Sequence, residues 1–156
     1  MLAALSGKTH RVLTAVVLTA PGAITQTGAI TASTSLTVTS STGEAITLAN
    51  AGNTVAAFSA TSSAAGTRGA VVFTNPNSGL TINGVTAGPV TITTRDGLVI
   101  SQAVTAGDPV APGAAGDGDI SLTSQLGSIT VNNTLTAYQD TITLNAVNGG
   151  ITFNPT

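Results

Sequence analysis

The chain has 156 residues, enough for one domain, and its formal net charge is −2. Only 6% of its residues are charged and 3% are aromatic, whereas about 25% charged residues is typical of globular domains. This charge gives no electrostatic basis for binding nucleic acid, and the absence of cysteine excludes disulfides and thiolate metal sites. No stretch approaches the roughly 18 apolar residues of a membrane span, so membrane insertion is not expected.

The first segment, residues 1–11, fits no repeat and stays unassigned, whereas residues 12–156 are predicted to form a single domain. Lys8, His10 and Arg11 followed by Val12–Ala20 resemble a short signal peptide. Val16–Thr19 also fits a first repeat strand that is followed by a Pro-Gly turn. The repeat interpretation accounts for more residues and is preferred.

Short alternating segments follow. Leu36–Thr39, Ile46–Leu48 and Val55–Phe58 are predicted strands, because alternation of aliphatic residues with threonine is typical of a half-buried strand. The next stretch, Ser59–Gly69, is predicted to be an irregular loop.

The clearest repeat runs from Gly84 to Gly107, which opens on GVTAG and closes on AVTAG. Two strands are predicted between these ends, Val90–Thr93 and Leu98–Ile100, and Arg95-Asp96-Gly97 forms the turn that joins them. Val71–Thr74 and Leu80–Ile82 match these two strands at offsets of 19 and 18 residues. A recurrence of about twenty residues made of short strands is typical of a solenoid.

The repeat continues after a second predicted loop, Asp108–Gly118, which is rich in proline, glycine and alanine. Ile120–Thr123 matches Val90–Thr93, and Leu135–Ala137 matches Val104–Ala106. The last predicted strands are Ile142–Leu144, which matches Ile120–Leu122, and Ile151–Phe153.

The predicted fold is therefore an all-β, right-handed parallel β-helix, with about seven coils of about 19–20 residues and two loop insertions. Inward aliphatic and outward threonine side chains are expected, with Gly and Asn providing positive φ angles at the corners. The alternative fold is a β-sandwich of about ten strands, in which Asn83-Gly84 and Asp96-Gly97 are hairpin turns. The recurrence of GVTAG at a fixed offset favours the solenoid.

Four strings are similar to the repeat regions of filamentous-haemagglutinin-like bacterial exoproteins of the two-partner secretion type and of autotransporter-like adhesins. These are VLTAPGAITQTGAITA (17–32), AITLANAGNTVAAFSA (45–60), GLTINGVTAG (79–88) and GDISLTSQLGSITVNNTLTA (118–137). The resemblance extends from about Val12 to Phe153 and implies an extracellular β-helix at the cell surface or released from it. The chain departs from the family in its short length and in lacking a clear signal peptide. Asn75-Pro76-Asn77 alone is too little to indicate a secretion domain.

No catalytic, cofactor-binding or metal-binding residues are predicted. The carboxylates are Glu44, Asp96, Asp108, Asp117, Asp119 and Asp140. The near pairs, Arg95 with Asp96 and Asp117 with Asp119, lie beside glycine, where aspartate is favoured for turn formation. A calcium site at Gly116–Asp119 would lack further spaced carboxylates, and His10 is the only histidine. Clustering of Glu44, Asp96 and Asp119 on one face would favour a carbohydrate-active β-helix enzyme.

The functional expectation is a structural unit of a bacterial extracellular or surface fibre, not an enzyme, that stacks on itself end to end because no cap is evident at either end. The alternative is an adhesive module that engages glycans, a host or an abiotic surface through loops 59–69 and 108–118 or through outward threonines. Four pairs of hydroxyl residues support that alternative and a less favoured ice-binding function: Thr37-x-Thr39, Thr91-x-Thr93, Ser121-x-Thr123 and Thr141-x-Thr143.

Overall fold

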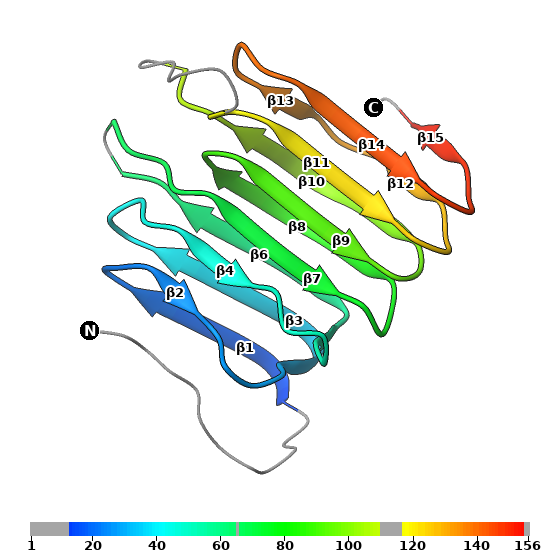
Figure 1. Cartoon of the computed structure of the whole chain (residues 1–156), viewed down its shortest axis with the longest axis horizontal. Helices are drawn as coiled ribbons and strands as arrows, with labels where there is room; N and C mark the ends of the chain where they lie inside the picture. Colours follow the sequence, from blue (N-terminus) through cyan, green and yellow to red (C-terminus); the bar gives the residue numbers. More distant parts are fainter. Residues whose placement is uncertain (1–12, 65, 110–116, 155–156) are drawn as a thin grey trace.

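The computed structural model describes residues 13–64, 66–109 and 117–154. Within these ranges the chain forms fifteen β-strands and no helix. The strands make two sheets that face each other, and the chain winds between them in about six turns (Figure 1). The unassigned segment 1–11, with Lys8, His10 and Arg11, lies outside the described residues.

The fifteen strands are divided between two sheets, sheet A and sheet B. Sheet A contains β1 (Leu13–Ala20), β3 (Thr31–Ser40), β5 (Thr54–Val55), β6 (Ala57–Ser62), β8 (Leu80–Ala87), β10 (Leu98–Ala106), β12 (Ile129–Val131), β13 (Leu135–Ala137) and β15 (Ile151–Phe153). Sheet B contains β2 (Ile24–Thr25), β4 (Ile46–Leu48), β7 (Val71–Asn75), β9 (Val90–Thr94), β11 (Ile120–Ser124) and β14 (Ile142–Ala146). Each turn of the solenoid therefore contributes to both sheets.

All pairs of neighbouring strands are parallel, which confirms the β-solenoid and shows that the β-sandwich alternative is wrong. The registers agree with the offsets in the sequence: Val71 pairs with Val90, Leu80 with Leu98, and Ile120 with Val90. Within the repeat, Val85 of GVTAG pairs with Val104 of AVTAG. The residue pattern alone therefore aligned these strands correctly.

Three details of the predicted coil differ from the structure. One column of sheet B runs from Ile46 to Val71, Val90 and Ile120, so successive coils there take 25, 19 and 30 residues, not a uniform 19–20. Sheet B has six strands, and the seventh coil expected from the sequence is a single strand of sheet A. The predicted loop Ser59–Gly69 begins late, because Ser59–Ser62 belongs to β6 and pairs with β3.

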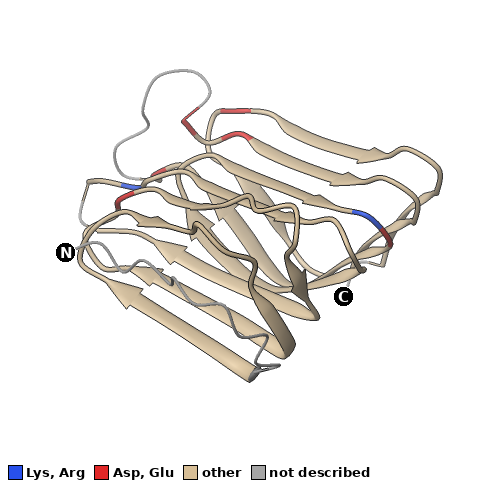
Figure 2. Ribbon diagram, turned by 60° about the horizontal axis from the view of Figure 1, so that its bottom comes forward, with Lys and Arg blue, Asp and Glu red and all other residues tan. Residues whose placement is uncertain are grey.

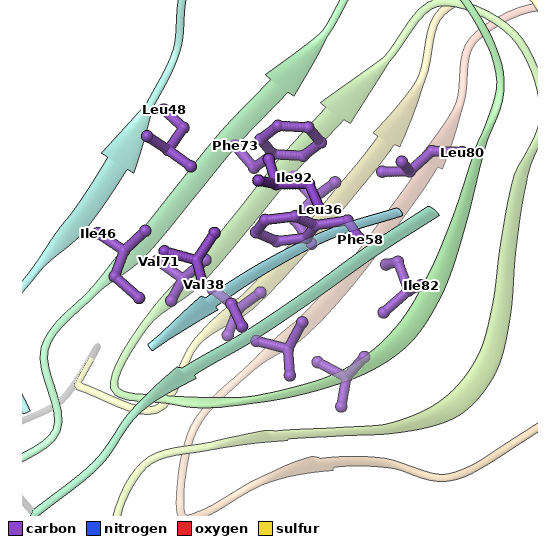
Figure 3. Close-up of a cluster of buried hydrophobic side chains, with 14 of the residues drawn as sticks. Leu36, Val38, Ile46, Leu48, Phe58, Val71, Phe73, Leu80, Ile82 and Ile92 are labelled. Carbon is purple, nitrogen blue, oxygen red and sulfur yellow. The ribbon is translucent and has the colours of Figure 1, made fainter. Parts of the chain in front are cut away.

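The core lies between the sheets and consists of the inward residues of the alternating strands. Phe58 on β6 and Phe73 on β7 meet across it, with ring centroids 4.1 Å apart and planes 8° from parallel (Figure 3). Leu36, Ile82 and Ile92 surround these rings and are fully buried. Stacking removes these side chains from water because each coil covers the one before it.

Buried polar side chains lie next to the ends of strands in both sheets: Ser40, Asn53, Ser62, Asn75, Thr94 and Ser124. Asn75 is fully buried; its amide nitrogen donates to Val55 O at 3.0 Å and Gly79 O at 3.1 Å, and its Oδ1 accepts the Val55 N–H at 2.8 Å. Asn53 bonds in the same way to Leu48 O and to the Ile30 N–H. These amides satisfy backbone groups that a bend leaves without a ladder partner.

Asparagine was expected to supply positive φ angles, and this expectation is wrong for the described corners. The positive φ angles there belong to four glycines and to Gln139, and to no asparagine. At Gly84 the φ is 97°, where sheet A bends within β8. Glycine provides the bend, whereas the buried asparagines provide hydrogen bonds between coils.

Candidate functional site

The charged residues of the described part of the chain lie at the turns (Figure 2). Glu44 and Asp119 precede β4 and β11 and so lie along the same corner of the solenoid, whereas Asp96 lies between β9 and β10 at the opposite corner. The β4 and β11 strands are three coils apart, which corresponds to roughly 14 Å along the axis. The three carboxylates whose clustering would indicate an enzyme are therefore not brought together.

The carboxylates near the second loop bond to the backbone of the neighbouring coil. Asp119 Oδ1 accepts the Thr141 N–H at 3.0 Å, and Asp140 Oδ2 accepts the Gly118 N–H at 2.8 Å. No group of three metal-ligating side chains occurs among the described residues. Gly116 of the considered calcium site and His10 lie outside the described ranges. Asp119 and Asp140 therefore connect adjacent coils.

A threonine ladder runs along the outside of sheet A. It contains one threonine from each of six successive strands, in register: Thr19, Thr39, Thr61, Thr86, Thr105 and Thr136. We call this set the threonine ladder. The ladder is a strip one residue wide in which threonine hydroxyl and methyl groups recur at each coil.

The four hydroxyl pairs expected on one face are divided between the two sheets, since Thr37-x-Thr39 lies on β3 of sheet A and the others belong to the sheet B side. Thr91-x-Thr93 and Ser121-x-Thr123 lie in register on β9 and β11. On β14, however, Thr143 pairs with Ser121 and Asn145 pairs with Thr123, so Thr141 is out of register with these columns. On the other side, Val72 interrupts the first column. The double array therefore covers two adjacent coils, which is a small area for matching an ice lattice.

A shallow groove crosses the start of the sheet A strands. It has a volume of about 580 Å³ and is lined mainly by small side chains of β3, β5 and β8, with Val99 of β10. Thr31, Ser33 and Thr81 supply hydroxyls, and no charged residue lines it. The groove has no group suited to acid–base chemistry.

The C-terminal end of the stack is open and apolar. Ile142, Ile151 and Phe153 are inward positions of the last turn, yet they are 41%, 42% and 62% exposed. They border a hollow of about 550 Å³ whose lining is almost entirely apolar: Val131, Asn133, Leu135, Ile142, Leu144, Ile151 and Phe153. We call this hollow the terminal hollow. The sequence indicated Ile151–Phe153 as an uncapped strand but did not reveal that Leu135, Ile142 and Leu144 share one surface with it.

The opposite end differs in exposure. Val16, Ala20 and Ile24 hold the inward positions of β1 and β2 and are 8%, 5% and 3% exposed. The outward Val17 is 70% exposed. Among the described residues, inward apolar side chains are therefore more exposed at the C-terminal end than at the N-terminal end.

Comparisons with known proteins return no match to a family model, to a curated protein or to a solved structure. The described residues contain no helix long and apolar enough to cross a membrane.

Proposed function

We propose that this chain is a structural β-solenoid unit of a bacterial extracellular or surface fibre, without catalytic activity, and that copies join end to end. The observation that carries the proposal is the open C-terminal end, where core positions are exposed. An exposed apolar patch with unpaired strand edges beside it is typical of an interaction surface. The resemblance of the repeats to those of exoprotein shafts supports the extracellular setting.

The sheets themselves support a head-to-tail joint. Sheet A begins with β1 and ends with β15, and sheet B begins with β2 and ends with β14. One inward column of sheet A runs through Val16, Leu36, Phe58, Ile82, Ile100, Val131 and Phe153. If β1 of a second copy pairs with β15 in parallel, Val16 lies over Phe153 and the column continues. Such a heterologous contact does not close, so it produces a filament.

The low charge favours the same arrangement. Lysine or glutamate at equivalent outward positions of successive coils would place like charges side by side, where they repel, and the same would hold for the coils that meet at a joint. The threonine ladder instead offers neutral side chains along the length of the molecule. This ladder also favours the second candidate, an adhesive module that binds a glycan or a solid surface.

Negative-stain electron microscopy over a concentration series tests the proposal. We expect thin fibres from the native chain and isolated rods from F153D, because a carboxylate would be buried in the joint. T91D is the matched control, since it places the same charge on an outward position of a middle strand. Fibres formed equally by F153D would contradict the joint, and rods at all concentrations would leave surface adhesion as the function to test.

Cysteine cross-linking gives a second test, because the native chain has no cysteine. Ala15 and Thr152 lie one residue before Val16 and Phe153, on the exposed face. A mixture of the single variants A15C and T152C should form a disulfide-linked heterodimer, since neighbouring strands lie within the range that a disulfide spans. A mixture of A15C and T143C, whose second cysteine is on sheet B, serves as the control.

A further inference from the structure

The connection between β6 and β7 forms a small hairpin at one corner of the solenoid (Figure 1). Ala64 and Thr67 exchange two backbone hydrogen bonds, of 2.9 and 3.1 Å, as an antiparallel bridge. Between them, Gly66 has a φ of 71°, which suits a tight reversal of the chain. The returning arm contains Arg68, so an arginine lies within a surface connection. We call residues 62–69 the corner hairpin.

The side chain of Arg68 fastens the corner hairpin to a coil two turns further along the stack. Its Nη1 donates to Gly107 O at 2.7 Å, although the two residues are 39 positions apart in the sequence. The coil between them passes at Gly88, whose N–H donates to Gly69 O at 2.9 Å. A Cβ on Gly88 would lie 2.3 Å from Arg68 O, so the missing side chain lets the two backbones meet. The guanidinium therefore reaches across one coil to bond to the next.

The peptide bond between Arg68 and Gly69 is held on both of its sides. Ser62 is fully buried; its Oγ accepts the Gly69 N–H at 3.1 Å and donates to Glu44 O at 2.7 Å. The carbonyl oxygen of Arg68 packs against the Gly88 backbone. A serine protease attacks the carbonyl carbon of the bond it cleaves and takes up the preceding side chain in a specificity pocket. In the closed corner hairpin, both groups of Arg68 are occupied by the solenoid itself.

We propose that the Arg68–Gly69 bond is a latent cleavage site for trypsin-like serine proteases, and that the Arg68 side chain is the strap that keeps this site closed. The protease needs the same guanidinium that bonds to Gly107 O, so the strap must open before cleavage. Water then adds across the peptide bond, which leaves a carboxylate on Arg68 and a new amino group on Gly69. Opening of the corner hairpin is a local event, because the strands on either side keep their ladders. The inference does not depend on the end-to-end joint.

The cleaved chain is expected to stay assembled. On one side of the cut, β6 pairs with β3 and with β8, and on the other side β7 pairs with β4 and with β9. Each fragment therefore keeps strands that are hydrogen-bonded to the other fragment. The stacked rings of Phe58 and Phe73 also come from opposite sides of the cut. Cleavage would change a surface loop that the adhesive alternative uses, without taking the solenoid apart.

Limited digestion of the full chain with trypsin tests the inference, with mass spectrometry following the new amino terminus at Gly69. The native chain should be cleaved there at least about a hundredfold more slowly than a synthetic peptide of residues 62–74. R68K keeps the charge and the trypsin site but loses the planar guanidinium. Relative to its own peptide, R68K should be cleaved about tenfold faster than the native chain, because the strap is a hydrogen bond from a charged donor. R95K, which changes the arginine of the opposite corner, is the matched control and should leave this rate unchanged.

Each part of the inference has a result that would overturn it. Cleavage of the native chain at the rate of the peptide would show that the corner hairpin is not closed. Equal relative rates for the native chain and R68K would show that the guanidinium is not the strap. A cleavage rate that rises with urea as steeply as global unfolding would mean that the site opens only when the whole chain unfolds. Size-exclusion chromatography of the digest should show one particle, and separated fragments would contradict the assembled product.

Discussion

The middle coils and the last turn, residues 142–153, are built from the same kinds of residues but differ in burial. Ile120 on β11 is fully buried, whereas Ile142, its register partner on β14, is 41% exposed. Phe73 in the middle is fully buried and Phe153 at the end is 62% exposed. The difference shows that a strand in this fold does not bury its own apolar side chains, because the next coil covers them. Matched substitutions in the two regions measure how much each coil gains from its neighbours.

The largest difference is expected for the two phenylalanines. F73A should lower the free energy of unfolding by about 3–5 kcal/mol, because it leaves a cavity beside the stacked ring of Phe58. F153A should lower it by less than about 1 kcal/mol, since that side chain is largely in water. Urea unfolding followed by circular dichroism measures both values. The chain concentration is kept low enough that copies do not associate. If F73A and F153A lowered the free energy of unfolding by similar amounts, burial by the next coil would not explain the difference between the two regions.

The next difference is expected for asparagine. N75A should cost about 2–4 kcal/mol, because the Val55 N–H and the carbonyls of Val55 and Gly79 lose their buried partner. N148A removes one exposed hydrogen bond, to Gln125 O at 2.8 Å, and should change stability by less than about 0.5 kcal/mol. The same unfolding experiment compares them, and a neutral N75A would show that water replaces the amide.

Glycine at the corners gives a smaller difference. A Cβ on Gly127 would lie 2.3 Å from the backbone nitrogen of Gly97, whereas a Cβ on Gly150 would meet nothing within 4 Å. We expect G127A to lower the midpoint of thermal unfolding, with a cost of about 1–3 kcal/mol, because the coils must move apart at that corner. G150A should be within about 0.5 kcal/mol of the native chain. Equal midpoints would mean that the corner absorbs a methyl group without strain.

The smallest difference is expected for threonine. Thr94 is fully buried and its hydroxyl donates to Ser78 O at 2.7 Å, so T94V should cost about 1–2 kcal/mol. T143V, at an exposed outward position of β14, should change stability by less than about 0.5 kcal/mol. Hydrogen exchange of the Gly79 and Leu80 amides gives a local measurement, and faster exchange is expected in T94V but not in T143V.

The sequence determined the fold class and much of the strand register. Offsets such as Val71 to Val90 and Ile120 to Ile142 are strand pairs in the structure, because a parallel solenoid places equivalent residues of successive coils side by side. The alternation of aliphatic residue and threonine also predicted which side chains point inward. Both properties are local or periodic, so they can be inferred from the order of residues alone.

Only the tertiary structure decided where the coils are open and which residues meet there. The buried roles of Asn53 and Asn75 depend on bonds to residues about twenty positions away, and their residue type indicated only a turn. The terminal hollow forms where side chains from four strands, β12, β13, β14 and β15, share one surface. Exposure depends on what covers a residue in space, and an inward position in the sequence pattern does not specify whether a further coil lies above it.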